Sequence, residues 1–522
     1  MIDDALIERL TAAAGKSAVS RDPGPCEYLA EDIFARERPA GAVVRPGSRQ
    51  ALAEVVRETV AAGHALVVRG GGMSYSLGYV PGERDSILID MRGLNRILEI
   101  NREDMSVTVE AGTTWRDLYL ALENIGLRTP CWGTLSGMHA TVGGSLSQNS
   151  IFWGSGRYGS AAESVLGMEI VLADGSLLRT GSAGQVHAAP FFRHHGPDLT
   201  GLFCGDCGVL GVKAVITLRL LPRYRGRAFG AFAFDDHRAT LSAMAEVSRC
   251  NLAMECFGFD PFLQRQRMRR ESIAGDVKRL VGVMKAADGV GRALTEGARV
   301  AAAGRGFMDD VLWSFSTMIE ERSVEAAAQS LRTVRDIAAE HGGQELPDSV
   351  PRVLRANPFG PLNNIIGPDG ERWAPVHGIL PHSRAVAAMD AIMTLMDDEA
   401  KRLEEHRIGI GHLLATVNTN ATVLEPVFFW PDALEEIHRR TVEPQHLRRV
   451  GGFPENLAAR TAVQEIRARL IRLFADLGAA HLQLGKSYLY REGLRPPNWK
   501  FIKSLKRQLD PTGRLNPGAL GL

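Results

Sequence analysis

The stretch Val67-Val68-Arg69-Gly70-Gly71-Gly72-Met73-Ser74-Tyr75 decides how the rest of the chain can be organised. Its two valines predict a strand that runs into three glycines. Because Gly70, Gly71 and Gly72 have no Cβ, their backbone can reach positive φ and turn successive N–H groups toward one anion. Arg69 adds a planar cation suited to phosphate. Taken alone, the stretch fits a plain surface turn as well as a cradle for a pyrophosphate.

A second run of small residues begins about seventy positions further along and favours the cradle. Gly137 to Asn149 holds glycine, serine and threonine, and Gly156-Arg157-Tyr158-Gly159 follows it. Backbone without bulky side chains lets a flat ligand lie directly against it. The Thr, Ser, Gln and Asn side chains offer donors and acceptors at intervals. Together the two runs predict a binding site for a flat, anionic ligand.

Short strands and helices alternate around these runs. We expect strands over residues 42–46, 65–68, 86–90 and 106–110. A helix over 48–62 would be capped by Ser48, and another over 115–125 would end at Gly126. A hairpin around Asp174-Gly175 and an apolar strand over 212–221 come next. The N-terminal part is therefore expected to mix α and β structure.

Length and composition exclude several classes of protein. With 522 residues, 45% hydrophobic and 23% charged, the chain should form two or more ordinary globular domains. A net charge of +1 favours neither nucleic acid nor an anionic membrane. No apolar run approaches the ~18 residues of a membrane helix, and the acidic start does not resemble an export signal. The six scattered cysteines suggest a reducing compartment, so we expect a soluble cytoplasmic protein.

The chain from the Arg69 turn to Pro222 resembles the FAD-binding domain of the vanillyl-alcohol oxidase and p-cresol methylhydroxylase family. The resemblance rests on residues 86–91, 109–114, 167–181 and 205–212, and on the C-terminal run Leu509-Asp510-Pro511-Thr512-Gly513-Arg514-Leu515-Asn516-Pro517-Gly518. It implies an α+β fold in which a two-part FAD-binding domain carries an α/β cap for the substrate. We expect the main part of the FAD-binding domain over 1–225, the cap over 226–480 and the returning segment over 481–522.

The resemblance also implies which residues bind FAD. The pyrophosphate would lie at the first glycine turn, with further flavin contacts from the second small-residue run, the 205–211 loop and the C-terminal run. The implied set is Arg69, Gly70, Gly71, Gly72, Met73, Ser74, Gly137, Thr141, Gly143, Gly144, Asn149, Gly205, Gly211, Val212 and Asn516. Relatives that attach flavin covalently at the first turn have a histidine where this chain has Met73. Attachment from the cap would use His377, unless His377 is an ordinary loop histidine.

The region 226–480 differs in composition from the part before it, because it is rich in alanine and arginine. Helices are expected over 323–341 and 384–406, with strand-like pieces at 230–234, 413–417 and 423–430. A cap domain over the flavin would place a small-ligand pocket between domains. The basic, glycine-interrupted stretch 275–306 is expected to be a solvated surface helix or a mobile segment, with a partner or membrane surface as the alternative.

The expected chemistry comes from the same resemblance. Tyr490 and Arg491 lie where the family's Tyr-Arg pair ionises a phenol, and Tyr75 falls near its second tyrosine. Two phenols and a guanidinium would stabilise a phenolate, or equally bind a carboxylate. His139 could serve as a base or be a buried, backbone-bonded histidine. A tyrosine and an arginine on a surface strand are the simpler alternative for Tyr490 and Arg491.

We therefore expect an FAD-linked oxidase or dehydrogenase that removes a hydride from a para-hydroxyphenyl alcohol or an alkylphenol. The electron acceptor (oxygen, a cytochrome or a quinone) stays open, and a homodimer is expected. The alternative is a D-2-hydroxy acid dehydrogenase, because Gly411-His412-Leu413 resembles the start of the metal-binding stretch in those enzymes. Their remaining ligands would fall at Thr419 and Ala480, so no metal is expected. A non-catalytic flavin-binding protein is the third possibility.

The remaining motifs are weaker. No G-x-G-x-x-G opens a helix after a strand, so a Rossmann dinucleotide enzyme is not expected. Gly15-Lys16-Ser17 and Gly485-Lys486-Ser487 resemble the end of a P-loop but lack its first glycine. Cys204 and Cys207 fit packing better than redox or metal chemistry.

Overall fold

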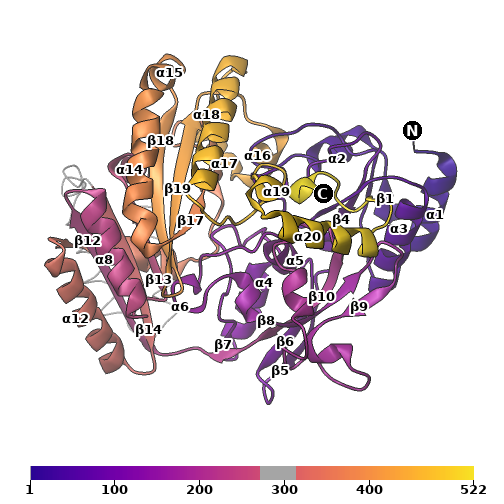
Figure 1. Ribbon diagram of the computed structural model, residues 1–522, viewed down its shortest axis with the longest axis horizontal. Coiled ribbons are helices and arrows are strands. Elements are labelled where there is room, and N and C mark those ends of the chain that lie inside the picture. The colour runs from indigo at the N-terminus through magenta and orange to yellow at the C-terminus, as the bar shows by residue number, and fades with distance from the viewer. Residues whose placement is uncertain (1, 271–312) are drawn as a thin grey trace.

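The computed structural model describes residues 2–270 and 313–522, so the basic stretch expected at 275–306 lies outside the described residues. Figure 1 shows two neighbouring bodies, one built from both ends of the chain and one from its middle. The first contains two small sheets and the second a single large sheet. The α+β fold expected from the sequence is confirmed.

The glycine turn leaves the edge of the first sheet, which has the order β1-β2-β4-β3. Its last three strands are parallel and β1 pairs with β2 antiparallel. The strands are β1 (Val19–Ser20), β2 (Ala42–Val44), β4 (Ile87–Asp90) and β3 (Leu66–Arg69). The expected helix after β2 is α3 (Arg49–Ala61), where Ser48 accepts a hydrogen bond from the Ala51 N–H at 3.1 Å. It packs beside α1 (Asp4–Ala14).

The second sheet is antiparallel and has the order β5-β6-β10-β8-β9. Its strands are β5 (Ile97–Asn101), β6 (Ser106–Glu110), β10 (Val212–Arg219), β8 (Val165–Val171) and β9 (Leu177–Arg179). Helices α5 (Val142–Ser147) and α7 (Leu199–Leu202) pack against this sheet. The same part of the chain also forms α2 (Pro23–Tyr28), which packs on β2, as well as α4 (Trp115–Glu123) and α6 (Ser155–Tyr158), and β7 (Leu127–Arg128) pairs with β11 (Leu221–Pro222). The second small-residue run therefore enters α5 beside this sheet.

The cap domain is built on one sheet of order β15-β12-β14-β13-β18-β19-β16, with β17 also paired to β19. Its strands are β12 (Gly226–Phe234), β13 (Glu255–Phe259), β14 (Trp313–Glu321), β15 (Gln344–Leu346), β16 (Arg372–Pro375), β17 (Gly378–Pro381), β18 (Gly409–Val417) and β19 (Ala421–Trp430). Its helices are α8 (His237–Arg249), α9 (Pro261–Arg270), α12 (Val324–Glu340), α13 (Ser349–Ala356), α14 (His382–Asp398), α15 (Ala400–Glu405), α16 (Glu436–Thr441), α17 (Pro444–Val450) and α18 (Leu457–Asp476).

The two faces of the cap sheet have different partners. Along β19, Val423, Val427 and Phe429 join the core shared with the FAD-binding side of the molecule. The alternating Leu424 and Phe428 join the core under the helices. Figure 1 shows α8, α12 and α14 together on the helix-covered side. This period-two alternation is what a sheet buried on both faces requires.

The end of the chain returns to the first sheet. The Leu66 N–H donates to the Arg514 carbonyl at 2.8 Å, and the Asn516 N–H donates to the Leu66 carbonyl at 2.7 Å. Between the cap and this contact lie α19 (Tyr490–Gly493) and α20 (Pro496–Leu509). The expected boundaries at 225/226 and 480/481 stay predictions. Across the described residues, no helix combines the length and the apolar character needed to cross a membrane.

Candidate active site

The glycine turn is packed so tightly that side chains would not fit. An ideal Cβ on Gly71 would lie 1.8 Å from the carbonyl oxygen of His139, and one on Gly70 would lie 2.3 Å from Oγ1 of Thr141. Gly72 has φ +79°, a left-handed conformation that other residues rarely adopt. The first glycine turn and the start of the second small-residue run are thus in direct contact, as the sequence pattern required.

Arg69 ends β3 as a buried cation. Its side chain is 0% exposed, and its guanidinium lies between the rings of Tyr28 and Tyr79, at 5.4 and 5.5 Å from their centroids. None of its three nitrogen atoms has a well-aligned hydrogen-bond acceptor among the described residues. The guanidinium lies against Gly72 and also interacts with the Tyr79 hydroxyl, so its positive charge favours an anion bound at the glycine turn.

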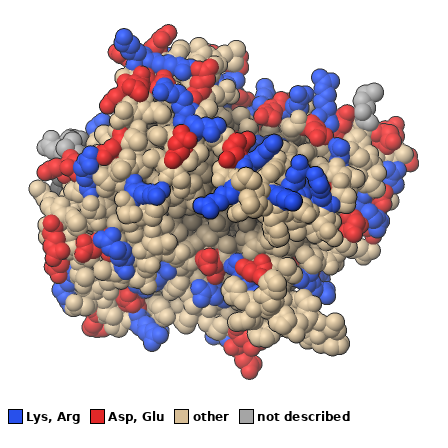
Figure 2. All heavy atoms as spheres, viewed as in Figure 1, with Lys and Arg blue, Asp and Glu red and all other residues tan. Residues whose placement is uncertain are grey.

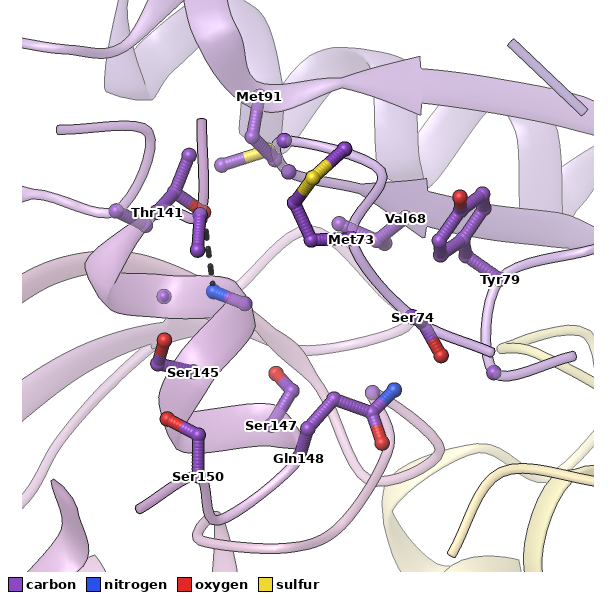
Figure 3. A pocket seen from close by; sticks show the side chains of 18 of the residues that line it. Val68, Met73, Ser74, Tyr79, Met91, Thr141, Ser145, Ser147, Gln148 and Ser150 are labelled. Atoms are coloured by element: carbon purple, nitrogen blue, oxygen red, sulfur yellow. Dashed lines mark hydrogen bonds between the residues drawn. The ribbon is translucent and has the colours of Figure 1, made fainter. Parts of the chain in front are cut away.

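Beside the turn lies a hollow with about 860 Å³ of empty space, part of it open to solvent. In Figure 3, Met73, Ser74 and Tyr79 line one side, and serines of the α5 region line the other. Thr141 caps α5 by accepting a hydrogen bond from the Gly144 N–H at 3.2 Å. Of the residues expected to bind FAD, ten line this flavin cavity: Gly70, Gly71, Gly72, Met73, Ser74, Thr141, Gly143, Gly144, Gly211 and Val212.

The structure adds lining residues that were not in the expected set. Gln148 follows α5, Lys213 lies on β10, and Gln483 belongs to the returning segment. Lys213 is buried and pairs with Asp206 at 2.6 Å. Since serine, glutamine and lysine are common everywhere in proteins, only the folded arrangement distinguishes these positions from others of their type.

Five expected flavin residues lie around the cavity without lining it. Gly137 faces Phe359 of the cap, whose ring would be 2.4 Å from a Cβ there. Asn149 and Gly205 approach each other, and the Gly205 N–H donates to the Leu146 carbonyl. Asn516 donates from Nδ2 to the carbonyls of Gly78 and Cys207, at 2.7 and 2.6 Å. These residues and Arg69 hold the cavity walls together.

His139 lies behind the glycine turn and is half-buried. Burial, followed by the nearby charges of Arg92, Arg69 and Arg116, lowers the pKa of its imidazole. The ring is therefore neutral at pH 7 and could accept a proton. The contact that the structure shows for His139 is a backbone contact, because its carbonyl oxygen occupies the space where Gly71 would carry a Cβ.

Next to the flavin cavity, Tyr75 belongs to a buried aromatic cluster drawn from three parts of the chain. Its ring lies 5.6 Å from Trp373 and 6.3 Å from His377, which follows β16 in the cap. Tyr488 of the returning segment lies 5.2 Å from His377 and stacks on His481 at 4.3 Å. Gln483, which lines the flavin cavity, also interacts with the Tyr75 phenol. We call Tyr75, Trp373, His377, His481 and Tyr488 the tyrosine cluster. It adjoins the flavin cavity through Gln483.

Tyr488 occupies the place in the cluster that was expected for Tyr490. Its hydroxyl accepts a hydrogen bond from the backbone N–H of His377 at 3.0 Å. It also lies 3.2 Å from Nδ1 of the His377 ring. Tyr490 instead packs at the edge of the main core, and Arg491 is exposed, with its guanidinium 5.4 Å from the Trp499 ring. Tyr490 begins α19, and the turn of that short helix carries Arg491 outward. The expected Tyr490-Arg491 pair is therefore not brought to Tyr75.

His377 has protein partners at both of its ring nitrogens. Nε2 lies 2.8 Å from the Leu482 carbonyl oxygen and 3.0 Å from the Leu482 N–H, and Nδ1 faces Tyr488. Burial, with a smaller contribution from His481, lowers the pKa of the His377 imidazole to about 3. The ring is therefore neutral at pH 7 and holds Tyr488 in place, and covalent attachment of the flavin at His377 stays a prediction.

His412, the first ligand position of the hydroxy acid alternative, points away from the flavin side. It lies on the same face of β18 as Leu414, which packs under the helices, and Nδ1 lies 2.9 Å from an Asp260 carboxylate oxygen. Its ring also faces Trp313 in the same helix-side core. In the part of the chain that the structure describes, no group of three or more His, Cys, Asp or Glu could hold a metal ion.

Comparison with known proteins assigns the cavity. Residues 40–181 match the family described as FAD binding domain. This region is an FAD-binding domain. It contains the glycine turn, α5 and the first sheet except for β1, so FAD is the cofactor that this part of the fold holds.

Similar sequences come from oxidases and dehydrogenases. The chain is 32% identical to the glycolate oxidase subunit GlcD of Bacillus subtilis over 184 residues, which is 35% of this chain and 37% of that protein. It is also 32% identical to the mitochondrial D-lactate dehydrogenase (cytochrome) of Arabidopsis thaliana over 225 residues, 41% of this chain and 37% of the relative. The chain thus matches little more than a third of the length of these relatives.

The whole fold resembles p-cresol methylhydroxylase. The crystal structure of that enzyme with substrate bound gives a TM-score of 0.73 at 16% identity, covering 99% of this chain and 96% of that one. Because the match includes both the FAD-binding domain and the cap, the expected fold of the p-cresol methylhydroxylase type is confirmed.

Proposed function

We propose that the protein is an FAD-dependent oxidoreductase whose glycine turn binds the diphosphate of the cofactor. Three features of the site support this. Gly70 and Gly71 leave backbone where a side chain would collide, the guanidinium of Arg69 is buried against Gly72, and α5 begins at a threonine cap beside the cavity. Backbone N–H groups with one buried cation are the donors that a diphosphate requires. The residues present therefore fit FAD.

When bound, FAD supplies the hydride acceptor, and the protein must orient the substrate and manage its charge. Tyr75 and Tyr488 can do both. Burial raises the pKa of each phenol, so both remain protonated at neutral pH and can donate hydrogen bonds to a substrate oxygen. His377 keeps Tyr488 in place from the cap side. Two donors aimed at one oxygen stabilise negative charge that develops on it during oxidation.

The substrate that this arrangement favours is a para-hydroxyphenyl alcohol or an alkylphenol, as in the vanillyl-alcohol oxidase family. A phenolic oxygen bound by Tyr75 and Tyr488 would become a phenolate more easily, which weakens the C–H bond at the para position. The observation that carries the proposal is the pair of buried phenols from distant segments, joined through His377 next to the flavin cavity. The ring of Trp373 lies beside Tyr75 and that of His481 beside Tyr488, and both would give an aromatic substrate apolar surface.

A D-2-hydroxy acid is the second candidate, and the similar sequences favour it. The glycolate oxidase subunit and the D-lactate dehydrogenase resemble this chain over 184 and 225 residues. In such a reaction the two phenols would hold the carboxylate or the hydroxyl of the acid. His412 lies on the other face of the cap sheet, so we propose that the acid would be oxidised without the metal.

Anaerobic bleaching of the flavin separates the two substrate classes. The purified holoprotein is mixed without oxygen with 4-hydroxybenzyl alcohol, 4-ethylphenol, D-lactate or D-2-hydroxyglutarate, and the loss of visible flavin absorbance is followed. We expect bleaching by the phenols and loss of that bleaching in Tyr488→Phe. Bleaching by hydroxy acids alone would reverse the substrate assignment, and bleaching abolished by a chelator would contradict the metal-free site. No bleaching by any donor would support the non-catalytic alternative.

The remaining parts of the proposal concern the setting of the enzyme. We propose a non-covalent FAD, a cytoplasmic location and a homodimer. Readmitting oxygen, cytochrome c or a quinone to the bleached protein identifies the electron acceptor by the rate at which the flavin colour returns.

A further inference from the structure

The last long helix of the chain, α20, lies on the surface of the molecule and turns a basic face outward. On its inner side Leu505 packs against the main core, and Lys506 is buried. On its outer side Lys500, Lys503 and Arg507 follow one another at spacings of three and four, so they form one exposed stripe. Figure 2 shows Lys and Arg side chains over the region where Figure 1 places α19 and α20.

The exposed cations of this part of the chain are not neutralised by acids. Within the described residues, no carboxylate lies in ion-pair distance of these side chains: Arg491, Arg495, Lys500, Lys503 and Arg507. Glu492 is the single acid between positions 491 and 509. Beyond the helix, Asp510 is already paired with Lys506 and Glu83 with Arg514. Since the whole chain carries a net charge of only +1, the excess of positive charge on α20 is local.

A buried lysine holds the helix with its basic face outward. Nζ of Lys506 donates to the carbonyls of Val209 and Leu515, each at 2.8 Å, and to a carboxylate oxygen of Asp510 at 2.5 Å. Val209 belongs to the 205–211 loop, and part of that loop lines the flavin cavity. The inner side of α20 is therefore fixed to the wall of the flavin cavity, while its outer side is left for a partner.

An exposed aromatic ring lies among these cations. Phe501, which directly follows Lys500, is 64% exposed. The half-buried ring of Trp499 lies 5.4 Å from the guanidinium of Arg491, so this arginine belongs to the same surface. The carboxylates of an acidic protein would pair with the cations but would offer nothing to the Phe501 ring. An anionic bilayer complements both, because its headgroups carry negative charge and its acyl chains accept an apolar side chain.

We propose that the outer face of α20, together with Arg491 and Arg495, is a docking surface for an anionic phospholipid bilayer. The helix lies parallel to the membrane plane, with its cations at the lipid phosphates and Phe501 inserted below them. Each lysine or arginine near such a surface strengthens binding about fivefold. The surface is separate from the flavin cavity, so it serves the enzyme whichever substrate is oxidised there.

Vesicle binding tests the surface in the unmodified holoprotein. The protein is mixed with vesicles of phosphatidylcholine alone, or of phosphatidylcholine and phosphatidylglycerol in equal amounts, and the bound fraction is measured by flotation. We expect binding to the mixed vesicles and none to the neutral ones. An increase in salt from about 0.05 M to about 0.5 M should release most of the bound protein, because salt screens the exposed charges.

Variants locate the effect on α20. Lys500→Gln combined with Lys503→Gln should weaken binding to the mixed vesicles by about tenfold or more. The matched control is Arg332→Gln combined with Arg335→Gln, which removes two exposed charges from α12, far from α20 (Figure 1). Phe501→Ala should weaken binding to the vesicles by about tenfold. Its binding to soluble polyglutamate, a polyanion without acyl chains, should equal that of the unmodified chain.

The outcomes separate a membrane surface from other roles of the same face. Equal binding to neutral and mixed vesicles, or a double lysine variant that binds as well as the α12 control, would overturn the proposal. Vesicle binding that is unaffected by Phe501→Ala, with polyglutamate bound as tightly as the mixed vesicles, would assign the face to an acidic protein instead. Flavin bleaching should be the same in every variant, because none of these side chains lines the flavin cavity. Failure of the membrane surface is thus seen apart from failure of the proposed function.

Discussion

Gly71 has less space for a side chain than its neighbours in the glycine turn, because a Cβ there would lie 1.8 Å from the His139 carbonyl. In Gly71→Ala either the turn or the 139–141 segment must move. Overpacking of this kind costs about 1–3 kcal/mol, so we expect FAD to bind about tenfold or more weakly. Gly47→Ala is the control, since nothing lies within 4 Å of its Cβ position. Titration of apoprotein with FAD, followed by flavin fluorescence, measures both; equal affinities would contradict the tight turn.

Tyr488 and Tyr490 provide a matched pair two positions apart. Tyr488→Phe removes a donor to the substrate oxygen, and a hydrogen bond to a charged group contributes about 1.5–3 kcal/mol, so kcat should fall about tenfold to a hundredfold. Tyr490→Phe should change kcat less than about twofold, because the residue lies outside the cluster. Stopped-flow flavin reduction compares the two. A larger loss in Tyr490→Phe would restore the Tyr490-Arg491 pair as the site.

Among single residues, the sequence identified site residues that belong to unusual local combinations. It missed site residues of common types that stand alone. Three glycines after an arginine, or Thr141 before two glycines, restrict the backbone locally and are visible without a structure. The choice between Tyr488 and Tyr490 depends on how a four-residue helix begins after Leu489. The contacts of Tyr75 with Trp373 and His377 join segments hundreds of positions apart, which no local pattern encodes.

Among the elements, β14 of the cap joins the FAD-binding side through buried ion pairs. Glu320 lies 3.2 Å from a nitrogen of Arg128, the last residue of β7, and 2.8 Å from a nitrogen of Arg355 on α13. All three side chains are almost fully buried. Further along the same contact, Arg157 of α6 donates to the Glu320 carbonyl at 2.9 Å. These pairs hold the cap against the sheet that carries the flavin cavity.

Glu320→Gln would leave two buried guanidinium groups without a countercharge. Removal of one partner from a buried pair costs about 3–5 kcal/mol, and we expect the free energy of unfolding to fall by that amount. Urea unfolding followed by near-ultraviolet circular dichroism measures it. The exposed pair of Arg335 and Glu345 serves as comparison, because Glu345→Gln should cost less than about 1 kcal/mol. Equal losses in the two variants would contradict the role assigned to the buried cluster.

Several elements were predictable because their signals are local, and others were not. The helix expected over 48–62 is α3, with Ser48 as its cap. The helix expected over 384–406 is instead two helices, α14 and α15, which meet at Glu399. Glu399 accepts from Arg469 of α18, so packing against a distant helix accompanies this break. The helical periodicity of the sequence continues through Glu399 and therefore does not predict the break there.

Over the whole molecule, the contact between cap and FAD-binding domain contains a second carboxyl, that of Glu255 on β13. It accepts a hydrogen bond from the Gly154 N–H at 2.6 Å, and burial raises its pKa from 4.5 to about 7. The folded chain therefore keeps this proton at pH values where the unfolded chain has lost it. By linkage, stability falls as pH rises from about 4.5 to 7, and the loss is complete above pH 7.

Glu255→Gln removes this pH dependence while keeping an acceptor for Gly154. The unmodified chain should lose about 2–3 kcal/mol of unfolding free energy between pH 5 and pH 8 relative to the variant. Urea unfolding of both proteins at the two pH values gives the difference. A difference of the opposite sign would mean that Glu255 is ionised and stabilised by Arg355 in the folded protein.

The family resemblance predicted the overall fold, because its motifs span the FAD-binding domain and the end of the chain. It could not predict which cap residues meet the returning segment. Tyr75, His377 and Tyr488 are separated by more than a hundred positions from one another, and only the completed fold brings them together.

The most direct test of the diphosphate site compares FAD with riboflavin, which has the same ring system without phosphates. Apoprotein prepared from the purified chain is titrated with each, and dissociation constants are obtained from flavin fluorescence. We predict that FAD binds at least about a hundredfold more tightly, since the glycine turn and Arg69 contribute several charge-assisted hydrogen bonds. Arg69→Gln should narrow that ratio by about tenfold or more. A chain that is purified colourless and binds FAD no more tightly than riboflavin would contradict the account.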